Sequence, residues 1–67
     1  ANINRNILLN DMEKYVNRLK LNGYILFSGF YEGVDFEMIN QKAVSLNLKL
    51  SRFEVSNKWM AAEFVKM

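Results

Sequence analysis

Residues 24–30, Tyr-Ile-Leu-Phe-Ser-Gly-Phe, form an apolar run that stops at a Ser-Gly pair and lies between two segments with helical periodicity. A run without polar alternation is typical of a strand that is covered on both faces, as in a parallel sheet flanked by helices. A chain of 67 residues can hardly cover both faces of such a sheet by itself. The run therefore predicts that this chain is the carboxyl-terminal part of a larger α/β domain.

The composition excludes several kinds of site. The chain has no cysteine and no histidine, so it contains no disulfide, no zinc-finger ligands of these types and no histidine or cysteine catalyst. Its net charge of +2 comes from interspersed charges, which argues against nucleic acid as a partner. No apolar stretch is long enough to span a membrane and no signal peptide opens the chain, so we expect a cytoplasmic protein without a membrane partner.

The first segment, residues 4–21, has the spacing of an amphipathic helix. The apolar residues on its one face are Leu8, Met12, Tyr15, Val16 and Leu19. Asn22-Gly23 follows, and glycine readily adopts the left-handed conformation that ends many helices. We therefore expect a helix that ends at Gly23 and a strand over residues 24–28.

The middle of the chain predicts a loop and a second helix. Residues 29–35 contain two glycines and read as the loop, with Asp35 as the N-cap. Apolar residues then recur at helical spacing over residues 36–46, and Asn47 suits a left-handed exit from the helix.

The last part of the chain predicts an antiparallel hairpin. Residues 48–55 alternate as in a strand, but the apolar side changes between Leu50 and Phe53, which indicates a bulge near Ser51-Arg52. A polar turn over residues 56–58 leads into a second β-rich run, residues 59–66. The expected order is helix, strand, helix, strand, strand, which fits the mixed edge of a mostly parallel sheet. Residues 1–67 would form one partial domain.

Three motifs, in order and spacing, resemble the carboxyl-terminal part of the ribosomal protein L11 methyltransferases. They are Ala1-Asn2-Ile3, the Asn-Gly-Tyr-Ile-Leu-Phe-Ser-Gly-Phe stretch of residues 22–30, and Trp59-Met60-Ala61. The resemblance implies a class I methyltransferase that depends on S-adenosylmethionine and has a seven-stranded, Rossmann-like sheet. In that sheet the last strand is antiparallel and lies between the two strands that precede it in the chain.

The resemblance also implies a reaction and partners. Family members methylate amino groups of ribosomal protein L11, namely lysine side chains and the amino terminus, and a separate amino-terminal domain recognises this substrate. We therefore expect a fragment of such an enzyme, whose structural partner is the rest of the catalytic domain. S-adenosylmethionine would bind only to the intact enzyme, because the glycine-rich turn and the acidic residue of the cofactor site are not in this sequence. The isolated fragment is expected to be inactive.

Asn2 is the one candidate active-site residue that the resemblance carries over. In the family the Ala-Asn-Ile tripeptide ends the fourth strand, and its asparagine points into the cleft between cofactor and substrate amine. An amide oxygen can orient a neutral amine by accepting an N–H bond without adding a charge. Asn4-Arg5, which follow, depart from the small or apolar residues common in the family. The alternative for Asn2 is a helix cap.

Two other functions stay open at this point. The chain could be a stand-alone module that binds another protein through an uncovered sheet face or edge, or part of a methyltransferase of the same fold that acts on RNA or a small molecule. A metal site is not predicted. Glu32, Asp35 and Glu37 are close in sequence, but acidic residues are common at helix N-termini for dipole reasons alone.

Overall fold

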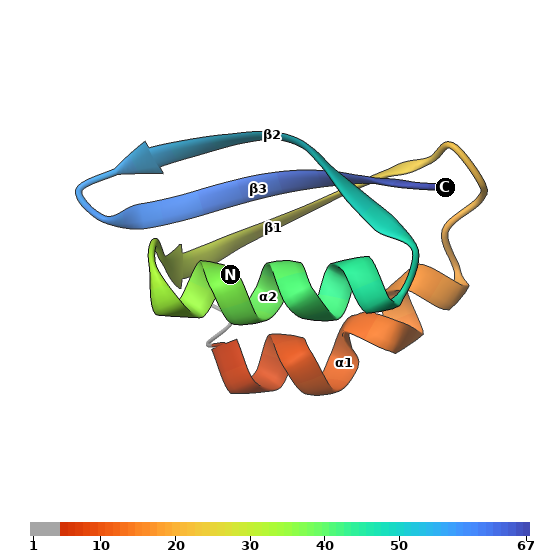
Figure 1. The fold of residues 1–67 in the computed structure, drawn as a ribbon, viewed down its shortest axis with the longest axis horizontal. Coiled ribbons are helices and arrows are strands. Elements are labelled where there is room, and N and C mark those ends of the chain that lie inside the picture. Colours follow the sequence, from red (N-terminus) through yellow and green to blue (C-terminus); the bar gives the residue numbers. More distant parts are fainter. Residues whose placement is uncertain (1–4) are drawn as a thin grey trace.

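The computed structural model describes residues 5–67, in which two helices cover one face of a three-stranded sheet (Figure 1). The elements are α1 (Arg5–Asn17), β1 (Tyr24–Tyr31), α2 (Val34–Ser45), β2 (Leu48–Ser56) and β3 (Trp59–Lys66). This order confirms the predicted helix-strand-helix-strand-strand arrangement and the α/β class. Neither helix of this region is long and apolar enough to cross a membrane.

The last strand, β3, lies in the middle of the sheet. The strand order is β1-β3-β2, and β3 runs antiparallel to both neighbours. It follows that β1 and β2 are parallel to each other on either side of β3, and that β2 and β3 form the predicted hairpin. The resemblance had implied a last strand inserted between the two before it, and the structure of these residues has that topology.

The bulge predicted in β2 is confirmed. The pairing of β2 with β3 shifts between Leu50 and Arg52, so Ser51 is the extra residue. Leu50 then pairs with Phe64, and Phe53 pairs with Ala62. Residues that are directly opposite share a face, so the bulge puts Leu50 and Phe53 on the side of the helices despite their odd spacing.

A second bulge makes β1 longer than predicted. The sequence assigned residues 29–31 to a loop, but β1 continues to Tyr31, and its pairing with β3 shifts between Ser28 and Phe30. Gly29 takes a φ of 89° at this point, a left-handed value that glycine adopts without strain. The glycine therefore bends the strand instead of ending it.

Helix α1 ends earlier than predicted, at Asn17 and not near residue 21. Lys66 Nζ donates hydrogen bonds to the carbonyl oxygens of Val16 and Leu19, both at 2.9 Å. The Val16 carbonyl also accepts the backbone N–H of Leu19 at 3.0 Å, so these contacts satisfy acceptors around the end of the helix. The left-handed residue after the helix is Asn22, with φ 66°, and not Gly23. Gly23 is needed for space instead, since a Cβ there would lie 2.9 Å from Leu19 Cδ1.

The prediction that Asp35 is the N-cap of the second helix is wrong. The N-cap is Gly33, α2 begins at Val34, and no side chain caps its first turn. Asp35 lies in that first turn, and its carboxylate is used by other elements, as described below. The predicted exit is confirmed, since Asn47 has a φ of 64°.

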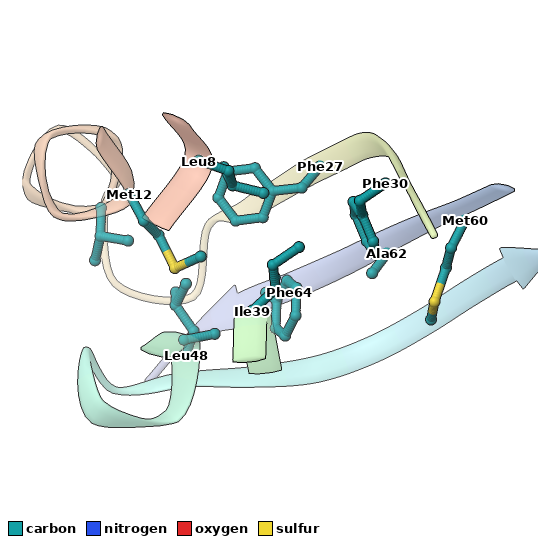
Figure 2. Packing of buried hydrophobic residues seen from close by; sticks show 11 residues of the cluster. Leu8, Met12, Phe27, Phe30, Ile39, Leu48, Met60, Ala62 and Phe64 are labelled. Carbon is teal, nitrogen blue, oxygen red and sulfur yellow. The ribbon is translucent and has the colours of Figure 1, made fainter. Parts of the chain in front are cut away.

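A single apolar core fills the space between the helices and the sheet. Figure 2 shows side chains from both helices and all three strands that meet in this cluster. The buried residues are Leu8, Met12, Val16, Phe27, Phe30, Ile39, Ala43, Leu48, Met60, Ala62 and Phe64. The predicted helix faces are largely confirmed, although Tyr15 is exposed and Leu19, Phe36 and Leu46 are only partly buried.

The opposite face of the sheet has no such cover. Phe27 and Phe30 of β1 are buried, whereas Tyr24 and Leu26 of the same strand are 62% and 64% exposed. The sequence predicted a strand covered on both faces, and within these residues only one face is covered. Helices α1 and α2 cover the core side of the sheet, and no element of residues 5–67 packs against the other side.

The burial pattern of α2 predicts that substitutions at two of its positions differ strongly in their effect on the free energy of unfolding. Ile39 is fully buried and Val44 is exposed. Replacing Ile39 with Ala should lower the free energy of unfolding by about 2–5 kcal/mol, because it leaves a cavity among the buried side chains. Val44→Ala is the matched control and should change it by less than about 0.5 kcal/mol. Denaturant titration of both variants measures the difference, and similar losses would contradict the assignment of the core face.

Candidate functional site

The carboxyl end of β1 is the candidate site. The end of β1, the start of α1 and the start of α2 lie at the same end of the molecule (Figure 1). Open α/β sheets bind their ligands outside the carboxyl ends of the parallel strands. In this chain β1 and β2 are the parallel pair, so this end is where the fold favours a ligand.

Asp35 joins the three elements at this end. Its Oδ1 lies 3.1 Å from Nη1 of Arg5, the first described residue of α1. Its Oδ2 accepts a hydrogen bond from the backbone N–H of Tyr31, the last residue of β1, at 3.4 Å. Because Asp35 itself belongs to the first turn of α2, one carboxylate connects α1, β1 and α2.

The ion pair between Arg5 and Asp35 is partly protected from water. The two side chains are 33% and 23% exposed, so solvent screens the pair only in part. The carboxylate also lies at the positive end of the α2 dipole, which favours its negative charge. These contacts explain why Asp35 does not cap α2: its carboxylate oxygens are engaged by the other two elements.

The candidate catalytic residue, Asn2, lies outside the described residues, so its role remains a prediction. Arg5 is three positions further along the chain and starts α1. The described part of the candidate site is therefore the ion pair between Arg5 and Asp35, which we call the anchor at Asp35.

The other side chains near the end of β1 fall into two groups. Phe30 belongs to the core and stacks with Phe36, at a centroid distance of 6.5 Å. Tyr31 points to the uncovered side and stacks with Trp59, at 4.3 Å. Trp59 is 42% exposed.

The described residues hold no group of side chains suited to a metal ion. Within residues 5–67, no three acidic side chains lie close enough together to hold a metal ion. Gly33 is the glycine between β1 and α2, and the sequence has no second glycine spaced to complete a phosphate-binding turn.

Sequence reasoning missed the link between Arg5 and Asp35. The two residues are 30 positions apart, and each was interpreted within its own segment. Opposite charges at the starts of two helices were the available signal, but only the packing of α1 beside α2 makes the pair specific.

Comparison with known proteins finds relatives that match nearly the whole chain. No protein-family model matches it. A curated protein of Porphyromonas gingivalis is 47% identical over 64 residues, which are 96% of this chain and 22% of that protein. Relatives from Bacteroides fragilis and Bacteroides thetaiotaomicron are 42% and 41% identical over 97% and 96% of the chain. The chain spans less than a quarter of each relative, namely 22–23%.

Each of these relatives is named as a methyltransferase. Their common name is ribosomal protein L11 methyltransferase. The three motifs had indicated this family, and the similarity over nearly the whole chain confirms it.

The anchor at Asp35 can be tested by a double-mutant cycle. Arg5→Ala, Asp35→Ala and the double variant should give a coupling of about 0.2–1 kcal/mol in the free energy of unfolding, as expected for a partly exposed pair. The coupling should shrink when salt is added. Glu32→Ala, an exposed acidic residue in the preceding turn, is the control and should show no coupling with Arg5→Ala. Zero coupling at low salt between Arg5 and Asp35 would refute the anchor.

Proposed function

We propose that this chain is the carboxyl-terminal segment of the catalytic domain of an S-adenosylmethionine-dependent protein methyltransferase that acts on ribosomal protein L11. The observation that carries the proposal is the identity of 40–47% to proteins named ribosomal protein L11 methyltransferase. The position of β3 between β1 and β2 also supports it, since the family resemblance implies this strand order.

In the proposed enzyme, β1, β3 and β2 form one end of a seven-stranded sheet. Within this chain β1 and β2 are the two edges of the sheet. The four remaining strands would lie beyond the free edge of β1, with the strand that ends at Ala1-Asn2-Ile3 directly beside it. The free N–H and C=O groups along that edge of β1 would then be paired, as a stable sheet requires.

The methyl donor would be held by residues upstream of this chain. This segment would instead act on the substrate side of the cleft through Asn2. The side-chain oxygen of Asn2 would accept an N–H bond from the substrate amine and so direct the nitrogen lone pair. A neutral amide suits this task, because a carboxylate in its place would favour the protonated amine, which has no free lone pair.

The substrate amines would be lysine side chains and the amino terminus of ribosomal protein L11. An amino-terminal domain outside this chain would recognise L11, and the reaction would take place in the cytoplasm. The 67 residues alone would be inactive, because the cofactor site and the L11-binding domain are both supplied by the rest of the polypeptide.

Methyl transfer by the full-length protein tests the proposal. Purified protein, L11 and S-adenosylmethionine with a labelled methyl group should give labelled L11, with the modified amines located by mass spectrometry. Labelling of RNA or a small molecule in place of L11 would show a different methyltransferase of the same fold. Failure of the full-length protein to bind S-adenosylmethionine would overturn the proposal altogether.

The role of Asn2 predicts a split between turnover and cofactor binding. Asn2→Ala in the full-length enzyme should lower kcat by roughly 10²-fold, because the amine loses its orientation, while the Kd for S-adenosylmethionine stays nearly constant. Asn10→Ala makes the same chemical change on the exposed surface of α1 and should leave both values unchanged.

A third variant separates catalysis from helix capping. Serine caps helices about as well as asparagine does but lacks the amide. Asn2→Ser should therefore keep the stability of the enzyme and still lose turnover. Normal turnover in Asn2→Ser would show that Asn2 is a cap and not an orienting residue.

A further inference from the structure

Strand β2 is an edge of the sheet, because it pairs with β3 on one side and with no other strand of residues 5–67 on its second side. In the proposed enzyme the remaining strands lie beyond β1, so the edge at β2 stays open. An open edge presents backbone N–H and C=O groups that can pair with a strand of another chain. The free edge of β2 is therefore a surface on which a second sheet can be added.

The part of β2 after its bulge is regular and exposed. The bulge lies at Ser51, and residues 52–56 pair with β3 without another shift in register. Each of these residues is exposed, and Figure 1 shows that this part of the hairpin extends past the start of α2. We call residues 52–56 the exposed half of β2. Bulges protect many sheet edges from pairing, but this bulge precedes the exposed half and leaves it straight enough to pair.

The side of the exposed half that faces the helices is apolar. Phe53 and Val55 lie on it and are 56% and 41% exposed. The ring of Phe53 contacts Phe36 of α2 at a centroid distance of 6.3 Å, and Phe36 stacks with the buried Phe30. Phe53 thus extends the core to the edge of the sheet, but more than half of its surface stays in water. Covering this ring with another apolar side chain would be favourable.

The side of the exposed half that faces away from the helices has one charge of each sign. Arg52 lies opposite Glu63 of β3, and Glu54 lies opposite Ala61. Arg52 Nη2 is 3.4 Å from Glu63 Oε2, but the side chain of Arg52 is still 79% exposed. The free edge therefore carries a positive and a negative side chain on either side of Phe53.

This order of residues is complementary to itself. If a two-fold axis passes through one residue of two antiparallel strands, that residue pairs with its own copy, and its two neighbours pair with each other. An axis at Phe53 places each Arg52 opposite Glu54 of the other copy, with Cβ atoms about 4.5–5.5 Å apart, and brings the two phenyl rings together. An axis at Arg52 or at Glu54 would place like charges opposite each other, which is unfavourable. Charge complementarity therefore selects the axis at Phe53.

We propose that the free edge of β2 is a dimerisation surface, through which two copies of the protein join their sheets about a two-fold axis at Phe53. The new contacts are backbone hydrogen bonds between the two β2 strands, two Arg52–Glu54 pairs and one contact between the Phe53 rings. Such an interface is isologous and closes on itself, so it gives a dimer and not a filament.

The proposal rests on the proposed function in one respect, namely that the other strands of the sheet lie beyond β1 and leave β2 at the edge. It does not depend on the methyl donor or on L11. Self-association can be measured in the absence of both, so a protein that methylates L11 as a monomer and a protein that dimerises without methylating L11 are distinct results.

Charge exchange in the full-length protein tests the interface. The wild-type protein should show a reversible monomer–dimer equilibrium in sedimentation experiments. Arg52→Glu puts two pairs of glutamates across the axis, and Glu54→Arg puts two pairs of arginines there, so each change should raise the dimer Kd at least about 10-fold. The double variant Arg52→Glu/Glu54→Arg restores opposite charges across the axis and should return the Kd to within about 3-fold of the wild-type value. Lys49→Glu reverses an exposed charge of β2 before the bulge and should have little effect.

The rescue by the double variant distinguishes the interface from a role of Arg52 within one chain. If Arg52 only paired with Glu63, then Glu54→Arg would not repair the effect of Arg52→Glu. Circular dichroism of each variant checks that the fold is kept. A wild-type protein that stays monomeric overturns the proposal, and so does a dimer whose Kd the single variants leave unchanged. Single variants that weaken the dimer without rescue in the double variant overturn the axis at Phe53.

A disulfide across the axis gives an independent readout. Residues directly opposite in an antiparallel pair have Cα atoms about 4.5–5.5 Å apart, which is within the range that a disulfide spans. Phe53→Cys should therefore form a covalent dimer on oxidation, linked between the two copies of position 53, and this chain contributes no cysteine of its own. Val44→Cys on the exposed surface of α2 is the matched control and should give less than about a tenth as much linked dimer. Peptide mass spectrometry identifies the linked positions, and equal linkage of the two variants would contradict the interface.

Discussion

The structure depends on the two-sided pairing of β3. This strand is the only partner of β1 and of β2 within the described sheet, so the sheet exists only when the last part of the chain is in place. Its inward side chains, Met60, Ala62 and Phe64, form the floor on which both helices pack. The end of β3 also organises the turns, since Lys66 binds the end of α1 and Met67 N–H donates to the carbonyl of Asn47. The carboxyl terminus thus contacts the end of α1 and the turn that follows α2.

The sequence predicted the features that local chemistry determines. The helical spacing around Ile39, the left-handed exit at Asn47 and the bulge at Ser51 all follow from neighbouring residues, and the structure confirms them. The prediction for the end of α1 was wrong because a lysine about 50 positions away satisfies its last carbonyl groups. The N-cap at Asp35 was wrong for a related reason, since its carboxylate binds Arg5 across the fold. No local pattern contains these contacts.

The one-sided burial of β1 agrees with the small share of each relative that the chain covers. An uninterrupted apolar run costs nothing in a strand that is covered on both faces, but it leaves Leu26 in water when one face is open. Natural antiparallel sheets with one open face usually alternate polar and apolar residues to avoid this exposure. The run therefore fits a strand in the interior of a larger sheet, and the short share of each relative that the chain covers is consistent with that reading.

The anchor at Asp35 bears on the candidate active-site residue Asn2 as well as on stability. An orienting amide works only when it is held within a fraction of an ångström of the productive geometry. Asn2 is three residues before Arg5, and Arg5 is held against the end of β1 and the start of α2 through Asp35. If Asn2 orients the substrate amine, then this ion pair, together with the packing of Leu8 in the core, would hold the start of α1 in place. The departure of Asn4-Arg5 from the small or apolar residues of the family then has a physical reason. A charged residue at this position lets the fold fix the start of α1 by an ion pair, where an apolar residue would have to rely on packing alone.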